Sequence, residues 1–367
     1  MSQLFHFADD LGPSKILGIY EPKLDLRGIL VVDNVATGPA IGGCRMAPDV
    51  TLEECVRLAR AMTLKNAAAG LPHGGAKSVI VGDPKMPAER KETVVRAFAH
   101  AIRDVRDYIM GPDMGLDERA MAWVHDEIER SVGRPREIGG IPLDEIGATG
   151  FGIAIAAEVA QEFCDVKLGG ARVAVQGFGA VGKHAARFLA ARGAVLVAAS
   201  DSTGTIVNPN GLDVPALIAF KDTGASVTAF SRGRPLAGEA IVSVNCDIWI
   251  PAARPDVITM ANVDSLRARL VLQGANIPAT AAAEQRLHER GILCLPDFIV
   301  NAGGVICAAV EYQHGTESAA FTAIEEKIRA NTRAVLEVAR RNKVIPRQAA
   351  LDLARERVLR AMSNRRF

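Results

Sequence analysis

The sequence lacks several patterns that mark whole classes of protein. Its six cysteines, at positions 44, 55, 164, 246, 294 and 307, form no CxxC pair, and most lie within apolar runs. Free cysteine in such surroundings behaves as a small hydrophobic residue, so we expect neither disulfides nor zinc. The seven histidines show no HExxH or similar spacing, and metal catalysis therefore has no support.

An excess of charge of one sign is also missing. Lys and Arg number 43 and Asp and Glu 42, which gives a formal net charge of +1. Nucleic acids and anionic membranes are bound by basic surfaces, so we expect neither as a partner. No run of about 18 uncharged apolar residues occurs, and the first 15 residues contain acidic side chains and no apolar core. These features predict a cytoplasmic protein without a membrane span.

The chain does have the length and apolar content for two domains. It has 367 residues, 49% of them hydrophobic, and one core seldom supports a chain of that size. We expect an α/β fold with an N-terminal substrate-binding and oligomerisation domain over residues 1–145. A Rossmann-type, doubly wound NAD-binding domain should follow over 146–331, with a cleft between the two. The C-terminal helices, over about 332–367, are expected to pack back onto the first domain.

The stretch AMTLKNAAAGLPHGGAKSVIVGDP, residues 61–84, holds two lysines twelve positions apart. Thr51 and Glu54 form a capping box at the start of an amphipathic helix that ends near Lys65. Lys77 opens a short apolar strand. Mutual repulsion and burial among Ala, Gly, Leu, Val and Ile should lower the pKa of one lysine, and a neutral lysine can act in acid and base catalysis. Solvated surface lysines are the alternative, and His73, between them, is expected only to shape the loop.

Two loops are expected beside these lysines. GPAIGGCRM, residues 38–46, is interpreted as a glycine-rich turn. DYIMGPDMG, residues 107–115, places Asp113 in a tight loop after an apolar run. Asp113 either caps the helix that begins near Asp117 or faces Lys77 across the site, and its spacing leaves both readings open.

The segment ARVAVQGFGAVGKHAARFLAARGAVLVAASDS carries a dinucleotide-binding pattern. GxGxxG at Gly177, Gly179 and Gly182 follows a predicted strand, opens a helix, and is followed 24 residues later by Asp201 at the end of the next strand. Gly177 permits the tight turn, Gly179 lets the pyrophosphate approach, and Gly182 lets helix and strand pack closely. Asp201 would bind the adenosine ribose and repel a 2′-phosphate, which favours NAD over NADP. Ser202 and Thr203 could nevertheless accept a phosphate.

Three further apolar runs, at 248–250, 270–272 and 293–295, each end in small or polar residues. Alternation with helices predicts a parallel sheet whose strand ends line a crevice. Asn276 and Asn301 follow two of these runs and are candidates for contacts to nicotinamide and substrate, although turn formation alone explains both.

Five motifs in order resemble the glutamate, leucine, phenylalanine and valine dehydrogenase superfamily over nearly the whole chain. They are MTLKNAAAGLPHGGAK, GPDMG, ATG at 148–150, GFGAVG, and NAGGV at 301–305. The resemblance implies reversible oxidative deamination of an L-amino acid to a 2-oxo acid and ammonia, in a homo-oligomer. It implies that Lys77 and Asp113 are catalytic and that Lys65 binds the substrate carboxylate. The implied cofactor contacts are Thr149, Gly177, Phe178, Gly179, Ala180, Val181, Gly182, Asp201, Ala252, Asn276 and Asn301.

The resemblance also addresses the substrate side chain. Where glutamate dehydrogenases have a lysine and a serine that meet the side-chain carboxylate, this sequence has Ile41, beside Gly42, and Ala308. A carboxylate without a partner costs several kcal/mol to bury. We therefore expect an apolar substrate (leucine, valine, isoleucine or phenylalanine), with Asn276 also near it, as in the leucine, phenylalanine and valine dehydrogenase-like branch.

Two alternatives remain at this stage. One is a glutamate dehydrogenase with an atypical side-chain pocket, because SDSTGTIVNPNGLD at 200–213 resembles the glutamate branch. The other is a non-catalytic NAD-binding regulator, which the presence of both Lys77 and Asp113 disfavours.

Overall fold

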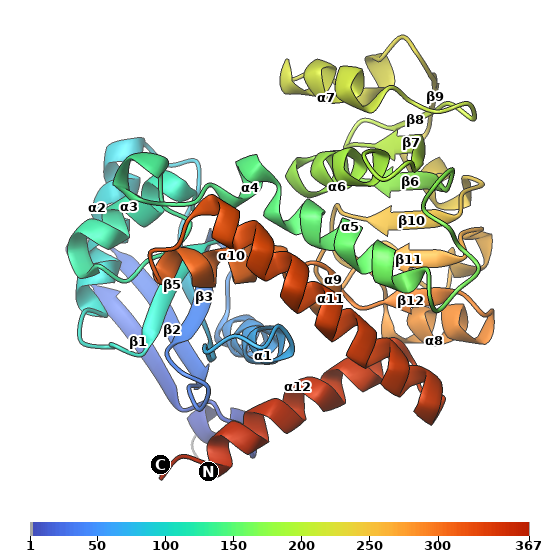
Figure 1. Cartoon of the computed structure of the whole chain (residues 1–367). Helices are drawn as coiled ribbons and strands as arrows, with labels where there is room; N and C mark the ends of the chain where they lie inside the picture. Colours follow the sequence, from blue (N-terminus) through green and yellow to red (C-terminus); the bar gives the residue numbers. More distant parts are fainter. Residues whose placement is uncertain (1–2, 367) are drawn as a thin grey trace. The chain divides into compact units, whose positions relative to one another are not determined.

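The computed structural model describes residues 3–366, and the chain divides into two compact units (Figure 1). The first unit runs up to Leu143 and also takes in Val305–Ala323 and the chain from Leu351 onward. The second consists of Asp144–Gly304 and Ile324–Ala350. The C-terminal part therefore divides differently from the expected 332–367. Residues 332–350 group with the second unit, in which Arg347 binds the carboxylates of Glu284 and Asp297.

The first unit contains a five-stranded mixed sheet in the order β1-β2-β4-β3-β5. β1 and β2 are antiparallel, β2 and β4 are antiparallel, and β3 lies parallel to both β4 and β5. The strands are β1 (Lys15–Glu21), β2 (Leu26–Asn34), β3 (Ala40–Ala47), β4 (Gly75–Val81) and β5 (Tyr108–Pro112). The helical segments are η1 (Gln3–Phe7), α1 (Leu52–Ala68), α2 (Ala88–Ala101), α3 (Glu118–Ile128), η2 (Arg136–Ile138) and most of α10 (Gly303–Tyr312).

Alternation along β2 shows how this sheet buries both faces. Leu30 and Val32 join one hydrophobic cluster with side chains of α2 and α3, whereas Val31 joins another with Cys55 and Ala59 of α1. Successive side chains of a strand point to opposite faces, so two helical layers can be packed from one sequence. One face of the sheet is therefore the α1 face, and Lys77 lies on it because Lys77 pairs with Val31.

The expected turn at residues 38–46 is wrong, because most of this segment forms strand β3 inside the sheet. Its glycines allow neighbouring segments of the chain to approach the strand closely. A Cβ added to Gly42 would lie 1.7 Å from the carbonyl oxygen of Ala76, and one added to Gly43 would lie 2.9 Å from the Cβ of Asp113. Glycine in a strand interior often marks such an approach.

The second unit contains a seven-stranded sheet in the order β12-β11-β10-β6-β7-β8-β9, with β8 and β9 antiparallel at one edge. The strands are β6 (Arg172–Gln176), β7 (Val195–Ser200), β8 (Thr205–Val207), β9 (Arg234–Leu236), β10 (Ile248–Pro251), β11 (Leu270–Leu272) and β12 (Leu293–Leu295). The helical segments within it are α5 (Ala148–Ala160), α6 (Ala180–Ala190), α7 (Val214–Asp222), η3 (Val227–Ala229), η4 (Gly238–Ser243), η5 (Val263–Ser265), α8 (Ala281–Glu289) and α9 (Asp297–Val300). The five parallel strands and their helices form the expected Rossmann-type fold.

Four helices of the described chain include residues of both units: α4 (Leu143–Ile146), α10, α11 (Glu317–Asn342) and α12 (Pro346–Ser363). The ATG segment, residues 148–150, forms the first turn of α5. Gly150 is needed there for packing, since an added Cβ would lie 2.5 Å from the backbone nitrogen of Ala185 in α6. No helix within residues 3–366 is long and apolar enough to cross a membrane.

Candidate active site

Lys77 is held on the α1 face of the first unit's sheet. It lies in the middle of β4, beside Val31 of β2, and its side chain is only 5% exposed. α1 packs tightly on this strand, because an added Cβ at Gly75 would lie 2.0 Å from the backbone nitrogen of Thr63. The Sγ of Cys55, on α1, donates to the Lys77 carbonyl at 3.3 Å. The glycines before the lysine therefore let a helix cover it.

The carboxylate of Asp113 forms an ion pair with the Lys77 ammonium through Oδ2. Asp113 directly follows β5, and β5 neighbours β3 in the same sheet. The alternative role for Asp113 as a helix cap is not observed, since Asp117 caps α3 by accepting a hydrogen bond from the Ala120 amide. Two groups 36 residues apart in the sequence thus meet at one site.

The pKa of Lys77 is lowered to about 8. Burial is the largest cause, the positive charge of Arg45 is next, and Lys65 contributes less. The predicted direction is confirmed, although repulsion by Lys65 is a minor part of it. Asp113 acts in the opposite sense, because a nearby negative charge favours the ammonium form.

Arg45, in β3, completes this cluster of charges. Its Nε and Nη2 each lie 3.3 Å from Oδ1 of Asp113, and its Nη1 forms an ion pair with Glu54 in the first turn of α1. Arg45 pairs with Val79 in the sheet, so it shares the α1 face with Lys77. If residues 38–46 had been predicted as a strand, the alternation of side chains along it would have placed Arg45 on the same sheet face as Lys77.

Lys65 lies in the last turn of α1, where two contacts fix the backbone. The side-chain amide of Asn66 donates to the carbonyls of Ile41, at 3.2 Å, and Gly74, at 2.7 Å. Arg357 of α12 donates to the carbonyls of Ala67 and Ala68, at 3.1 and 2.8 Å. The last carbonyls of a helix lack their usual partners. Arg357 adds a donor to the Ala67 carbonyl, which also accepts from the Gly70 amide at 2.9 Å, and it supplies one to the Ala68 carbonyl.

Ile41, Gly42 and Ala308, expected around the substrate side chain, are in the first unit, whereas Asn276 is in the second. Ile41 is buried in β3 and Ala308 is buried in α10. Tyr312 lies one turn beyond Ala308, and its ring contacts that of His73 at 5.8 Å between centroids. His73 is also hydrogen-bonded through Nδ1 to the Pro39 carbonyl, at 3.0 Å, two residues before Ile41. His73 therefore touches both segments that bear the expected pocket residues.

The glycine-rich loop of the second unit has the geometry that a dinucleotide needs. Gly177 has φ +90°, and an added Cβ at Gly182 would lie 2.0 Å from the Gly177 carbonyl oxygen. A Cβ at Gly179, by contrast, would meet nothing within 4 Å. Gly179 is the N-cap of α6 and no side chain caps that helix, so its first amides face open space. A helix N-terminus of this kind binds phosphate.

Asp201 is placed at the end of β7, as predicted, but its carboxylate is already engaged. Oδ1 accepts from the amide of Thr203 at 3.0 Å and from Ser226 at 3.1 Å. Oδ2 accepts from Lys221 at 2.7 Å and from the amide of Val227 at 2.9 Å. Burial alone would raise the pKa of Asp201, but these donors, with Lys221 foremost, lower it to about 2.

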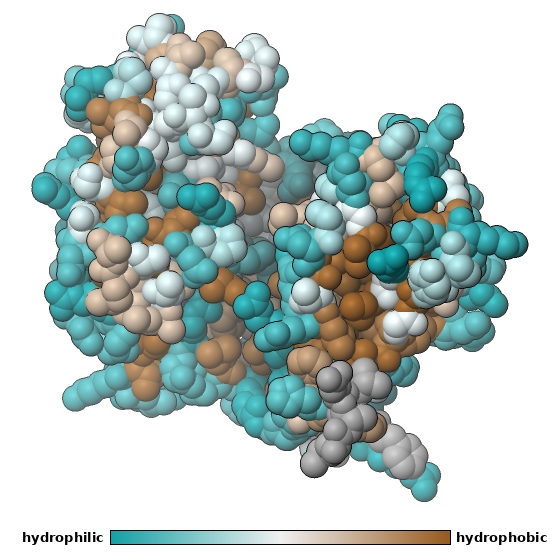
Figure 2. Space-filling model, turned by 180° about the vertical axis from the view of Figure 1, so that it is seen from behind, coloured by the Kyte–Doolittle hydropathy of each residue, from teal (hydrophilic) through white to brown (hydrophobic). Residues whose placement is uncertain are grey.

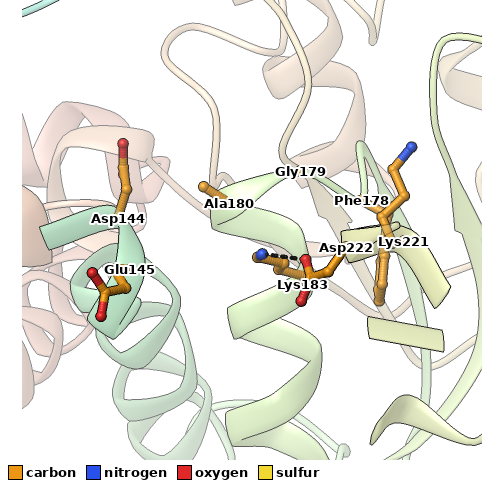
Figure 3. Close-up of a pocket in the computed structure, with 8 residues that line it drawn as sticks. All are labelled: Asp144, Glu145, Phe178, Gly179, Ala180, Lys183, Lys221 and Asp222. Atoms are coloured by element: carbon orange, nitrogen blue, oxygen red, sulfur yellow. Dashed lines mark hydrogen bonds and ion pairs between the residues drawn. The ribbon is translucent and has the colours of Figure 1, made fainter. Parts of the chain in front are cut away.

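Lys221 also lines a pocket of about 370 Å³ beside the glycine-rich loop (Figure 3). The other lining residues are Asp144, Glu145, Phe178, Gly179, Ala180, Lys183 and Asp222. Lys183 projects from α6 and forms an ion pair with Asp222 at 2.8 Å. Lys221 was not predicted, because nothing in the sequence marks a lysine in α7 as a partner of Asp201.

The remaining predicted contacts are spread along the carboxyl edge of this sheet. Asn301 donates to Asn276 at 3.0 Å and to the Gly274 carbonyl at 3.3 Å, so the structure brings these two asparagines together. Ala252 follows β10 and donates its amide to the Gln176 carbonyl at 2.7 Å, next to the glycine-rich loop. Thr149 lies apart from them in the sequence, in the first turn of α5.

Known proteins similar to this chain are enzymes that act on amino acids. Glutamate dehydrogenase of Aeropyrum pernix is 38% identical over 90% of this chain and 85% of its own length. The NADP(+)-dependent glutamate dehydrogenase of Pyrobaculum calidifontis is 37% identical, over 96% and 91%. The NAD-specific glutamate dehydrogenase A of Halobacterium salinarum is 36% identical, over 88% and 78%.

Solved structures agree with this grouping. The hetero-hexameric glutamate dehydrogenase of Thermus thermophilus, in its Leu-bound form, superposes with a TM-score of 0.85 at 30% identity and covers 95% of this chain and 89% of its own. L-tryptophan dehydrogenase of Nostoc punctiforme superposes with a TM-score of 0.76 at 26% identity, over 98% and 99%.

Two sequence patterns of one enzyme family together match nearly the whole chain. Residues 23–130 match the Glu/Leu/Phe/Val dehydrogenase dimerisation domain, and residues 139–366 match the Glutamate/Leucine/Phenylalanine/Valine dehydrogenase pattern. The superfamily inferred from the five motifs is thereby confirmed, but its leucine, phenylalanine and valine branch is not specified by these matches. This chain, an amino-acid dehydrogenase that uses a nicotinamide dinucleotide, belongs to the Glutamate/Leucine/Phenylalanine/Valine dehydrogenase family.

Proposed function

We propose that the protein catalyses reversible oxidative deamination of an L-amino acid, with Lys77 as the catalytic base and Asp113 as its proton partner. The observation that carries the proposal is the buried Lys77–Asp113 pair, in which the pKa of Lys77 is lowered to about 8. A lysine of that pKa is partly neutral at mildly alkaline pH and can accept a proton there.

The chemistry assigns a step to each residue. Lys65 would bind the substrate carboxylate through its ammonium and orient Cα. Bound nicotinamide would supply the acceptor for the hydride of Cα, which would leave the substrate as an iminium ion. Neutral Lys77 would then take a proton from water as its oxygen bonds to Cα. Asp113 would take a proton from the substrate ammonium before the hydride leaves and would return it to the departing nitrogen. The proton of the new hydroxyl would pass to solvent, so that ammonia leaves and the carbonyl of the 2-oxo acid forms.

The second unit is proposed to hold the dinucleotide at the start of α6. The open space at Gly179 and the uncapped amides of α6 fit a pyrophosphate. Phe178, Ala180 and Val181 would shape this loop, and Thr149, Ala252, Asn276 and Asn301 are proposed for the rest of the cofactor.

The preference for NAD stays a proposal. Relatives include both NAD-specific and NADP-dependent enzymes. Lys221 neutralises Asp201, and a carboxylate with four donors has little capacity left for ribose hydroxyls. These contacts reduce the discrimination that we expected from Asp201, so we propose use of NAD together with measurable use of NADP.

Two substrate classes are supported by different observations. Glutamate is favoured because the relatives above 35% identity that we compared are glutamate dehydrogenases. An apolar amino acid is favoured by Ile41 and Ala308, which offer a side-chain carboxylate no partner. Tryptophan dehydrogenase, with the same fold, is named for an apolar aromatic substrate.

His73 could reconcile glutamate with this pocket. Its Nδ1 must carry a proton, because its partner is a carbonyl oxygen that can only accept. Its Nε2 is buried and has no hydrogen-bond partner among residues 3–366. A protonated ring could therefore donate from Nε2 to a substrate carboxylate. Burial lowers the pKa of free His73, and a bound carboxylate would raise it again.

A homo-oligomer is proposed for the assembled enzyme. Residues 23–130 match a dimerisation domain, and one similar solved structure is a hetero-hexamer, which supports association between subunits of this fold. Apolar side chains gather on the surface of this unit (Figure 2). The partly buried apolar residues around α1 and its sheet face are Ile16, Ile29, Ala47, Leu52, Val56 and Val81. A patch of this kind suits association with a second copy.

The test is a direct assay of the purified protein. NAD or NADP is supplied with each of a panel of L-amino acids, and absorbance of the reduced coenzyme is followed. Turnover with at least one amino acid is expected, and Lys77→Ala should abolish it while coenzyme binding, followed by fluorescence, persists. A regulator without activity would bind coenzyme and turn over none of the panel, which would overturn the proposal.

A further inference from the structure

We propose that Arg45 is a positioning residue that holds one oxygen of Asp113 and thereby governs when Lys77 becomes a base. The inference rests on the proposed function, since it assigns Arg45 a task in the same site. Arg45 itself need not touch the substrate. It acts through Asp113 and through its own fixed charge.

The two oxygens of Asp113 have different partners. Oδ1 lies 3.3 Å from both Nε and Nη2 of Arg45, and Oδ2 pairs with Lys77. The amide of Met114 also donates to Oδ1. A carboxylate whose two oxygens are bound by different cations cannot rotate freely, so Oδ2 stays directed at the lysine.

Arg45 is held from the other side by Glu54. Its Nη1 pairs with the Glu54 carboxylate, and Glu54 is fixed in the first turn of α1 because its amide is capped by Thr51 at 3.2 Å. The guanidinium is planar and presents its donors as a rigid fork, so one arm can bind Glu54 while the other binds Asp113. The side chain is only 20% exposed, which limits screening by solvent.

The titratable groups near Lys77 come from the elements packed against it. β3 contributes Arg45, α1 contributes Cys55 and Lys65, and the loop after β5 contributes Asp113. Cys44 of β3 pairs with Ser78, so it lies on the opposite face of the sheet. Burial raises the pKa of each thiol to about 12, so both are neutral near pH 8. Arg45 therefore supplies a permanent cation against the single carboxylate of Asp113.

Loss of Arg45 acts on Lys77 in one direction. The nearby positive charge disappears, and both oxygens of Asp113 become available to the lysine. Each change favours the ammonium form, so the pKa of Lys77 rises. Deprotonation, and the rate that depends on it, then requires a higher pH.

The experiment compares pH profiles of kcat/KM for deamination of the amino acid that wild type prefers. In Arg45→Gln the alkaline-rising limb should move up by about half a pH unit or more. Arg45→Lys keeps the positive charge but loses the planar guanidinium that binds Asp113 and Glu54 together. Its alkaline-rising limb should lie closer to that of wild type, while its kcat should be lower than that of wild type. Arg96→Gln is the matched control, because Arg96 forms its ion pairs with Glu92, Asp126 and Glu127 of the same unit. Its profile should match wild type.

A pH profile of Arg45→Gln that overlays that of wild type, or one lowered equally at all pH values, would overturn the proposal.

Competitive acetylation of Lys77, quantified by mass spectrometry across pH, measures the titration of Lys77 without catalysis. If wild type deaminates no amino acid, the proposed function fails, and the acetylation midpoint still decides whether Arg45 sets the titration of Lys77. If Arg45→Gln does not fold, Glu54→Gln decides instead, because loss of that carboxylate leaves the positive charge of Arg45 less compensated and should lower the midpoint for Lys77. A midpoint unchanged in Glu54→Gln would overturn the inference.

Discussion

The Nζ of Lys221 lies 2.7 Å from Oδ2 of Asp201, so the acid expected to choose the coenzyme is already paired. The pair joins the end of α7 to the end of β7. Since a neutralised carboxylate repels a phosphate weakly, coenzyme choice depends on two residues rather than one.

Lys221→Ala should shift the preference toward NAD. Asp201 would lose its cation, accept ribose hydroxyls and repel a 2′-phosphate. The ratio of kcat/KM for NADP to that for NAD should fall by about tenfold, the factor that corresponds to roughly 1.4 kcal/mol. Arg232→Ala, which removes an exposed ion pair with Asp213, should leave the ratio unchanged. An unaltered ratio in Lys221→Ala would show that this pair does not discriminate between the coenzymes.

Gly179→Ala and Gly182→Ala should separate cofactor binding from folding. A methyl group at Gly179 meets no protein atom within 4 Å, so thermal unfolding should stay near wild type while dinucleotide affinity falls. At Gly182 the methyl group meets the Gly177 carbonyl at 2.0 Å, so the second unit should lose stability as well. Calorimetry and titration with NAD measure both properties. Equal affinity for NAD in wild type and Gly179→Ala would exclude the pyrophosphate from this position.

Arg347→Ala should destabilise the second unit strongly. Arg347 pairs with Glu284 at 2.6 Å and Asp297 at 2.9 Å, and both carboxylates are at least nine-tenths buried. Removal leaves two buried charges unpaired, at a cost of about 3–5 kcal/mol in the free energy of unfolding. Urea denaturation measures this cost, and Arg286→Ala, which breaks an exposed pair with Asp264, serves as control. Similar midpoints for the two variants would refute the buried network as a source of stability.

The pH dependence of inhibition should identify the polar group of the substrate pocket. If His73 donates to a side-chain carboxylate, the dissociation constant of glutarate should rise with pH as the ring loses its proton. A monocarboxylate of similar size should show no such rise, because it lacks the second carboxylate. His73→Leu should remove this difference in pH dependence between glutarate and the monocarboxylate. In a separate assay, the double variant Ile41→Lys, Ala308→Ser should raise kcat/KM for glutamate relative to that for an apolar amino acid. Glutarate binding that is independent of pH in wild type would eliminate His73 from this role.

The features that local sequence predicts well are those built by neighbouring residues. The GxGxxG loop, the strands on either side of α6 and the helix capped by Thr51 all depend on spacing within about 30 residues, and each is present. The pairing of Lys77 with Asp113 was one of two open readings, because a loop aspartate commonly caps a helix.

The features that local sequence patterns do not predict depend on strand pairing and helix packing between distant segments. Glycine usually signals a turn, so β3 was misread, and Arg45 was missed with it. In β3 the glycines instead give room to Ala76 and Asp113. The ring contact of His73 with Tyr312 likewise joins residues far apart in the chain, and no local pattern encodes it. The bonds of Asp201 to Lys221 and Val227 span only 20 and 26 residues, but they depend on tertiary packing rather than on a sequence motif.

The bonds from Arg357 to the carbonyls of Ala67 and Ala68 have a consequence for biosynthesis. The end of the helix that carries Lys65 is thus held by a residue synthesised 290 positions after Ala67. The first unit as a whole draws on the chain from Leu351 onward. A nascent chain therefore cannot form these two bonds until Arg357 has left the ribosome. A premature stop before Arg357 would leave both carbonyls without this guanidinium.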